Sequence, residues 1–327
     1  MYLWSLFPAV LVILGNMMGG WWVALNAVFS LVILVFLEKL LPENKENDSE
    51  VNVFLPNMLL QLHVLMQLLV FISAVYALRS HVFSPTMLLL MGMSMGINTG
   101  GSAIVIAHEL IHRKNKYYRF LGKFLLFTAS NIYFYVDHLR IHHKWVGTEK
   151  DHATARKGES VYSFFIRSVT GQIAGSWKLE TARLQNEGIV KRIFDNYLIA
   201  SIVLIVLIIA AFYALAGWSG VLVILIQAVF ANFLLEYTNY IEHYGLYRLD
   251  NERVTEMHSW QSDKVISRYF LIDLSRHADH HYYASKPYHT LKTYEKAPVL
   301  PGGYVEMIYY ALIPPLWFRA VDRLLIK

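Results

Sequence analysis

The sequence predicts an all-α integral membrane protein with about six transmembrane helices and a histidine-rich cap. Hydrophobic residues make up 56% of the 327 residues and charged residues only 16%, whereas a soluble domain carries roughly 25% charged residues. Several apolar runs reach the ~20 residues with which a helix crosses a bilayer. Because these runs alternate with the polar stretches, we expect a single domain over residues 1–327.

The six expected spans follow the apolar runs along the chain. They cover roughly residues 2–18, 20–41, 57–79, 85–112, 196–216 and 219–245. Glycine-containing turns at 15–20 and 217–220 join the first two and the last two spans. Pro85 starts the fourth span, where its missing N–H costs little. Two prolines interrupt the apolar stretch 304–321, which we therefore expect to lie at the membrane interface or to re-enter it.

The basic residues predict the orientation of the spans. Of the 29 Lys and Arg residues, 15 lie in residues 113–195 and 11 lie after residue 247. With an even number of spans these segments share one face, which the positive-inside rule makes cytoplasmic. We therefore expect a multi-pass protein of the inner (plasma) membrane, with both termini and the segments 113–195 and 246–303 in the cytoplasm. The acidic 42–55 loop falls on the same face.

Nine of the fourteen histidines form four clusters beside the apolar spans. The clusters consist of His108 and His112; His138, His142 and His143; His243; and His277, His280 and His281. On a helix, residues four apart lie on one face, one turn apart. Both members of the first pair, and of the pair His138 and His142, are therefore expected to reach one metal centre. Nine imidazoles are too many for one metal ion and about right for two, so we expect the cytoplasmic cap to hold two.

The residue types favour a redox metal over zinc. Imidazole suits zinc, copper, iron and nickel, and nine imidazoles exceed what tetrahedral zinc requires. The chain has no cysteine, which excludes thiolate-bound zinc, iron–sulfur clusters and disulfides. Carboxylates that orient the imidazoles from outside are expected at Glu109, Asp137, Glu242 and Asp279. We expect ordinary structural roles for the other histidines: His63, His81, His152, His258 and His289.

Two functions that do not use a redox metal also fit part of the histidine pattern. Residues 108–112 (HELIH) satisfy the H-E-x-x-H motif of zinc proteases, in which the glutamate is the general base. Such an intramembrane protease needs one further ligand and leaves the other clustered histidines without a role. A metal transporter would place its ligands along a path through the bilayer midplane, whereas these lie at span ends or in cytoplasmic segments. The net charge of +5 follows from topology and anionic lipid, so we expect a lipid bilayer and no nucleic acid as partner.

The segments around the clusters resemble those of a known enzyme family. The segments are HELIHRK, DHLRIHHKWVGTEKDHATARKGES, NYIEHYGLYR and LSRHADHHYYASKPYHTL. They are similar to the histidine boxes and HYG motif of the membrane alkane hydroxylases (alkane 1-monooxygenases), within the membrane fatty acid desaturase and hydroxylase superfamily. The likeness covers roughly residues 85–300. Asp137 stands where the family usually has Glu, and His152 replaces a common Pro.

By this resemblance, all nine clustered histidines hold a di-iron centre, and no separate acid or base is assigned. The implied reaction is O2-dependent hydroxylation of the terminal methyl of an alkane to a primary alcohol, on an apolar substrate that enters from the bilayer. The box spacing is shared with desaturases and xylene methyl hydroxylases, so a related desaturase or alkylaromatic methyl hydroxylase is the alternative. The chain has no G-x-G-x-x-G fingerprint after a strand pattern and no cysteine, so another protein must supply electrons. The family implies rubredoxin and rubredoxin reductase.

Overall fold

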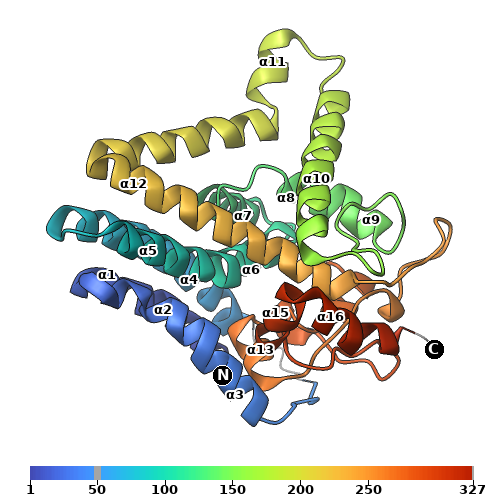
Figure 1. The fold of residues 1–327 in the computed structure, drawn as a ribbon. Helices are drawn as coiled ribbons and strands as arrows, with labels where there is room; N and C mark the ends of the chain where they lie inside the picture. The colour runs from blue at the N-terminus through green and yellow to red at the C-terminus, as the bar shows by residue number, and fades with distance from the viewer. Residues whose placement is uncertain (48–52, 326–327) are drawn as a thin grey trace. The chain divides into compact units, whose positions relative to one another are not determined.

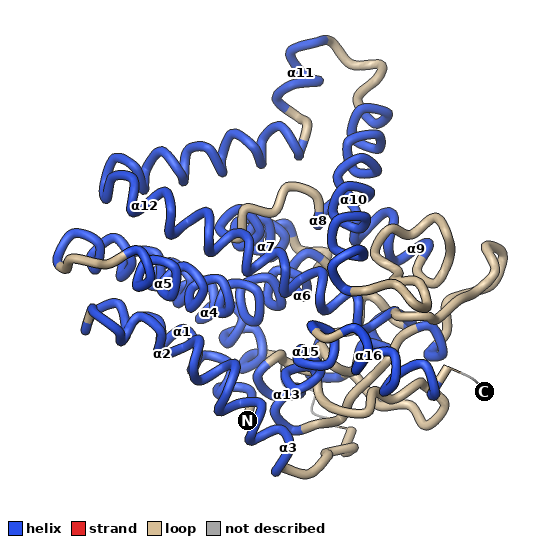
Figure 2. The backbone as a smooth tube through the Cα atoms, viewed as in Figure 1, coloured by secondary structure: helices blue, strands red, loops and turns tan. Residues whose placement is uncertain are grey.

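The computed structural model describes residues 1–47 and 53–325. Within them the chain forms helices and two isolated β-bridges but no strand (Figure 1, Figure 2), which confirms the all-α class. Residues 48–52 of the expected 42–55 loop lie outside the described residues. The chain forms two compact units, each made of three segments. The first unit is Met1–Ile33, Asn52–Ile132 and Lys178–Leu234, and the second is Leu34–Val51, Tyr133–Trp177 and Leu235–Lys327.

Four helices are long and apolar enough to cross a membrane, as the integral membrane class requires. They are Gly20–Leu40, Phe54–Ser80, Pro85–Ile111 and Tyr197–His243, and Tyr2–Met18 is a shorter apolar helix. The helix α12 (Tyr197–His243) contains a kink at Gly217, whose φ of 63° and ψ of −155° are not helical. This kink falls in the expected turn 217–220 and divides α12 into two apolar helices (Figure 1). The number of six crossings stays a prediction.

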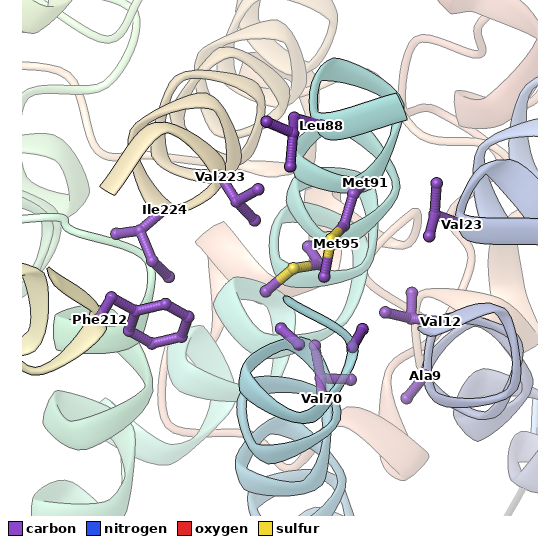
Figure 3. Packing of buried hydrophobic residues seen from close by; sticks show 12 residues of the cluster. Ala9, Val12, Val23, Val70, Leu88, Met91, Met95, Phe212, Val223 and Ile224 are labelled. Atoms are coloured by element: carbon purple, nitrogen blue, oxygen red, sulfur yellow. The ribbon is translucent and has the colours of Figure 1, made fainter. Parts of the chain in front are cut away.

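The first unit contains most of the apolar helices. Its elements are η1 (Tyr2–Leu6), α1 (Phe7–Met18), η2 (Gly20–Ala24), α2 (Leu25–Val28), η3 (Phe29–Ile33), α4 (Phe54–Ser80), α5 (Pro85–Asn98), η4 (Thr99–Ile104), α6 (Val105–Ile111), α7 (Lys116–Thr128), α11 (Ile189–Phe194) and most of α12. Buried side chains from α1, α4, α5 and α12 form its apolar core, including Val12, Val70, Met91 and Ile224 (Figure 3). Their close packing supplies the dispersion contacts that hold helices together in lipid.

Glycines on α5 and η4 let this helix approach α12 closely. Gly92, Gly96 and Gly100 lie four residues apart, and Cβ atoms added there would meet the side chains of Ile226, Phe230 and Leu234, which are also four apart. The G-x-x-x-G spacing places the small residues along one stripe of the helix. The close approach of α5 and η4 to α12 along this stripe therefore depends on the absence of side chains at the three glycines.

Replacing Gly96 with Ala should destabilise the protein. The new Cβ would lie 2.5 Å from Cβ of Phe230 and 2.8 Å from the carbonyl oxygen of Gln227, so the helices must separate at an expected cost of about 1–3 kcal/mol. Gly101 on the same helical stretch is the matched control, because a Cβ there has no described heavy atom within 4 Å. Gly101→Ala should be neutral or stabilising by up to ~1 kcal/mol. Thermal melting in detergent compares the two, and equal melting temperatures would contradict the packing argument.

The second unit is built from short helices and loops. Its elements are α3 (Leu34–Leu40), α8 (Phe134–Asp137), η5 (His138–His142), α9 (His143–Trp145), most of α10 (Val161–Arg183), the end of α12, η6 (Glu256–His258), α13 (Val265–Phe270), α14 (His277–Tyr282), η7 (Tyr288–Thr290), α15 (Tyr304–Leu312), α16 (Pro314–Val321) and η8 (Asp322–Leu324). The interruption expected in 304–321 falls at Ile313, between α15 and α16. With nine and eight residues, each of these helices is too short to cross a bilayer.

A buried carboxylate anchors the end of α3 within the second unit. Glu38 accepts hydrogen bonds from the backbone N–H of Ser267, at 3.0 Å, and from that of Glu306, at 2.7 Å. The second of these N–H groups lies in the first turn of α15, where helical N–H groups have no partner within the helix. Glu38 therefore caps α15 from a distant part of the sequence. A side chain at Gly303 would collide with this carboxylate.

Two fully buried arginines hold the segment 44–46 in the second unit. Arg268 pairs with Asp273 at 2.7 Å, and Arg276 pairs with Asp263 at 3.3 Å. Both guanidinium groups also donate to carbonyls of residues 44–46. Each arginine uses several of its five donors in this way, so that the buried charge is paired and hydrogen-bonded. Arg276 directly precedes the last histidine cluster, whose backbone is therefore fixed by these contacts.

Candidate metal centre

The second unit brings seven of the nine clustered histidines into two adjacent groups. The three-histidine group consists of His138, His143 and His280. The four-histidine group consists of His142, His243, His277 and His281, which are all buried. Within each group the candidate ligand nitrogens lie within 4.8 Å of one another. The groups are in contact, because the rings of His143 and His281 have centroids 4.7 Å apart.

Two members of the four-histidine group have a defined tautomer. Nδ1 of His243 lies 3.2 Å from the carbonyl oxygen of His258. A carbonyl only accepts, so Nδ1 carries the hydrogen and Nε2 keeps its lone pair. Nδ1 of His142 likewise faces the Asp151 carboxylate at 2.9 Å, while its Nε2 lies 3.1 Å from Nε2 of His281. Both rings therefore present a lone pair toward the centre of the group.

These ring nitrogens are better suited to binding a metal ion than to forming hydrogen bonds with one another. Nε2 of His243 is buried and has no hydrogen-bond partner among residues 1–47 and 53–325. In the three-histidine group, Nε2 of His143 lies 2.9 Å from Nε2 of His138 and 3.1 Å from Nε2 of His280. A ring nitrogen carries either one hydrogen or one lone pair, so it cannot pair well with both neighbours. A cation among these nitrogens would satisfy every lone pair, and imidazole suits iron, copper, nickel and zinc.

Burial keeps the ring of His281 in the neutral form that a metal ligand requires. His281 is buried, and this burial together with the neighbouring imidazoles lowers the pKa of His281 well below its ordinary value. The ring is therefore neutral at physiological pH, as a metal ligand must be. Protonation would place a charge among several buried imidazoles.

The division of the histidines differs from the expected i, i+4 pairing at one cluster. His138 and His142, expected to reach one centre together, lie in different groups. The reason is local backbone geometry, because residues 138–142 form a π-helix. A π-helix closes i to i+5 hydrogen bonds, which brings His138 and His143 to one face. In α14 the ordinary spacing holds, so His277 and His281 share a group while His280 joins the other.

The first unit holds the remaining two candidate ligands. His108 lies in α6, and His112 is the residue that ends this helix. Their ring centroids are 5.2 Å apart, as the i, i+4 spacing predicts. The π-helix η4 directly precedes α6, and such turns occur frequently at functional sites.

The four expected outer carboxylates have different surroundings. Glu242 contacts a candidate ligand, with Oε2 3.1 Å from Nε2 of His277. Asp279 accepts hydrogen bonds from the backbone N–H of Lys292 and the hydroxyl of Tyr294. An outer role for all four carboxylates stays a prediction.

Asp137 and Glu109 lie in different electrostatic surroundings. Asp137 is buried, and this burial raises the pKa of Asp137 well above its ordinary value, with further contributions from Asp151 and Glu236. Burial thus favours the protonated form of Asp137. Glu109, in the first unit, pairs with Arg113 at 2.5 Å.

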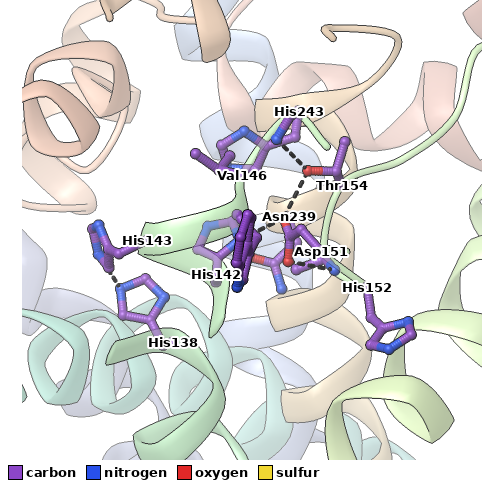
Figure 4. A network of polar contacts seen from close by, with 12 residues as sticks. His138, His142, His143, Val146, Asp151, His152, Thr154, Asn239 and His243 are labelled. Atoms are coloured by element: carbon purple, nitrogen blue, oxygen red, sulfur yellow. Dashed lines mark hydrogen bonds and ion pairs between the residues drawn. The ribbon is translucent and has the colours of Figure 1, made fainter. Parts of the chain in front are cut away.

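Asp151 is the carboxylate that the sequence did not indicate. It follows His142 by nine residues through a loop, so no helical spacing connects the two. Burial favours the protonated form of Asp151, but the contact with His142 and a hydrogen bond from Thr154 outweigh it and hold the pKa of this carboxyl below its ordinary value. Figure 4 shows Asp151 beside His142, and His138 facing His143.

Histidines outside the two groups have structural contacts. His63, in the first unit, lies 2.8 Å from the hydroxyl of Ser5 and 2.7 Å from that of Ser102. The ring of His258 takes part in a capping box with Thr255. Its backbone carbonyl orients His243, a contribution that side-chain patterns do not reveal.

Comparison with known proteins identifies relatives of this chain. A family model described as "Fatty acid desaturase" matches residues 83–311. "Alkane 1-monooxygenase 2" of Pseudomonas aeruginosa is 40% identical over 235 residues, which cover 70% of this chain and 62% of that protein. "Alkane 1-monooxygenase" of Acinetobacter baylyi is 35% identical over 72% of this chain and 59% of its own length. The matched part is thus less than two thirds of these relatives. The xylene/toluene monooxygenase hydroxylase component of Pseudomonas putida is 25% identical over 95% of this chain and 84% of its own length.

Proposed function

Because the chain belongs to the fatty acid desaturase family, we propose that it is an O2-dependent monooxygenase that converts the terminal methyl of an alkane to a primary alcohol. One observation carries the proposal: seven imidazoles with no thiolate converge in two adjacent groups. Relatives named alkane 1-monooxygenases support alkanes as the substrate class. The balanced reaction takes the alkane, O2, two electrons and two protons to the alcohol and water.

Two iron ions are the proposed cofactors. The four-histidine group offers four ligands to one ion, and the three-histidine group offers three to the other. His108 and His112 are proposed as further ligands on the ground of their helical spacing and of the family resemblance. Reduced iron would supply the O2 chemistry that no amino-acid side chain provides.

The protein's own contribution is to hold and orient these ligands. The carbonyl of His258 and the carboxylate of Asp151 fix two rings in the tautomer that presents Nε2. Burial of the four-histidine group excludes bulk water, which protects reactive states from side reactions. We propose that the alkane reaches this site from the bilayer, since its chain is apolar.

An external electron donor completes the proposed system. Rubredoxin and rubredoxin reductase would supply the two electrons at the face that bears residues 113–195, which carry 15 of the 29 Lys and Arg residues. This face would be the cytoplasmic side of the inner (plasma) membrane, with both termini on the same side. An acidic donor would be attracted to this basic surface.

A second candidate is the hydroxylation of an alkylaromatic methyl group. The xylene/toluene relative covers 95% of the chain, which is more than any of the alkane relatives described above. Both reactions attack an apolar methyl group, and the histidine groups do not distinguish them. The family description leaves desaturation as a third outcome.

The decisive experiment combines metal analysis with a substrate panel. The full chain in lipid nanodiscs is supplied with rubredoxin, rubredoxin reductase and NADH, and offered alkanes of several lengths and xylene. Two irons per chain and a terminal alcohol are expected. A benzylic alcohol without alkane oxidation would favour the second candidate, and a new double bond would indicate desaturation. One zinc and no oxidation would contradict all three and favour the HELIH zinc-protease motif.

A further inference from the structure

Asp151 lies at the boundary between the four-histidine group and a surface pocket of the second unit. The pocket has a volume of about 170 Å³, and its lining includes Asp151, Thr154, Arg156, Lys157 and Arg167. This is room for several waters, each of which occupies ~30 Å³ in the liquid. The Asp151 side chain itself is not exposed and lies against His142, so its removal would open a space beside this pocket that a small solute can fill.

The contacts of Asp151 define which atoms it can orient. Oδ2 lies 2.9 Å from Nδ1 of His142 and accepts the Thr154 hydroxyl at 2.6 Å. Oδ1 accepts the backbone N–H of Ala153 at 3.1 Å. With the side chains of both Asp151 and His142 almost fully buried, the carboxylate has little freedom to rotate. A charge-assisted hydrogen bond in such a setting is stronger than a neutral one.

We propose that Asp151 is a positioning residue that locks the ring of His142, and that the adjacent pocket admits small carboxylates that can replace it. The inference rests on the proposed function in assigning His142 as a ligand. The bond from Nδ1–H to the carboxylate leaves the lone pair on Nε2, and it also raises the basicity of that lone pair. Arg156, Lys157 and Arg167 line the pocket together with Glu149, which pairs with Arg156, while Arg167 pairs with Glu159. Once Asp151 is replaced with Ala, these three cations face one remaining lining carboxylate, which favours the entry of an anion.

The competing explanation is that Asp151 only stabilises its loop. Thr154 separates the two roles, because its hydroxyl both donates to Asp151 and accepts the N–H of Gly147. Thr154→Val removes these loop contacts but leaves the carboxylate against His142. A loop role predicts that this variant weakens metal binding as much as Asp151→Ala does. A positioning role predicts that it does not.

Cobalt(II) binding to the full chain in nanodiscs tests the proposal without reference to turnover. Asp151→Ala should weaken the binding of one of two cobalt ions by about 10–100-fold. Millimolar formate should restore it, whereas chloride at equal ionic strength should not, and Thr154→Val should stay within a few-fold of the parent. Unchanged cobalt affinity in Asp151→Ala, an equal loss in Thr154→Val, or a loss that formate does not reverse would overturn the proposal.

This design separates the inference from the proposed function. If the parent chain binds two cobalt ions but oxidises no alkane with iron, the proposed reaction is wrong and the role of Asp151 stands. If alkane oxidation is found but Asp151→Ala keeps both ions at full affinity, the role of Asp151 is wrong and the proposed reaction stands.

Discussion

Replacing His142 with Ala should abolish turnover and remove one of two irons, while leaving membrane insertion intact. His142 is central to the site, because its Nε2 faces His281 at 3.1 Å and its ring stacks on that of His138 at 5.3 Å. Loss of an outer partner of a ligand costs about 10–100-fold in metal affinity or activity, and loss of the ligand itself should cost more. Iron per chain and alcohol formation measure the two effects.

His152→Ala is the matched control for this variant. His152 is half-buried in the same loop region, packs against Gly171 and belongs to neither histidine group. It should keep both irons and most of its activity. Full turnover in His142→Ala would refute the assignment of this residue as a ligand, and equal losses in both variants would indicate a structural effect.

Replacing Arg276 with Met should be among the most destabilising single changes outside the histidine groups. The substitution keeps much of the volume but leaves Asp263 as a buried carboxylate without its cation, and it removes donors to the carbonyls of Leu291 and Glu46. Breaking a buried ion pair by removing one partner costs about 3–5 kcal/mol. The melting temperature in detergent should fall by roughly 10 °C, from ~2–4 °C per kcal/mol for a unit of this size.

Two further variants serve as controls for Arg276→Met. Lys150 and Asp250 form an exposed pair at 2.7 Å, and Lys150→Ala should cost at most ~1 kcal/mol. The double variant Arg276→Met with Asp263→Leu should recover part of the loss, because no unpaired charge remains. A melting temperature for Arg276→Met within 2 °C of the parent, judged against the ~2–4 °C expected per kcal/mol, would show that the pair contributes little.

The integral membrane class and the histidine clusters could be predicted because both depend on residues that lie close together in the sequence. Apolar runs of membrane length indicate helices irrespective of the tertiary structure. The pairs His108 and His112, and His277 and His281, keep the i, i+4 relation that a regular helix imposes. These features need no information from distant parts of the chain.

Other features could not be predicted, because they depend on backbone irregularity or on distant contacts. The π-helix at 138–142 separates two histidines that ordinary helical spacing joins. The carboxylate of Asp151 and the carbonyl of His258 reach the rings of His142 and His243 through loops. Glu38 meets the N–H of Glu306 across 268 positions of sequence, a pairing that no periodicity encodes.

The long reach of Arg276 has a consequence for the order in which this protein matures. Its guanidinium holds the carbonyl of Glu46, 230 positions earlier in the chain, and it directly precedes His277. Among the described residues, the helices that are long and apolar enough to span a membrane end no later than His243, so all of them are synthesised before this arginine. Contacts of such sequence separation form slowly. Under the proposed function, metal loading at the four-histidine group would therefore follow the insertion of these helices, because a ribosome stalled after residue 270 would carry a chain that still lacks His277 and His281, two of the four candidate ligands.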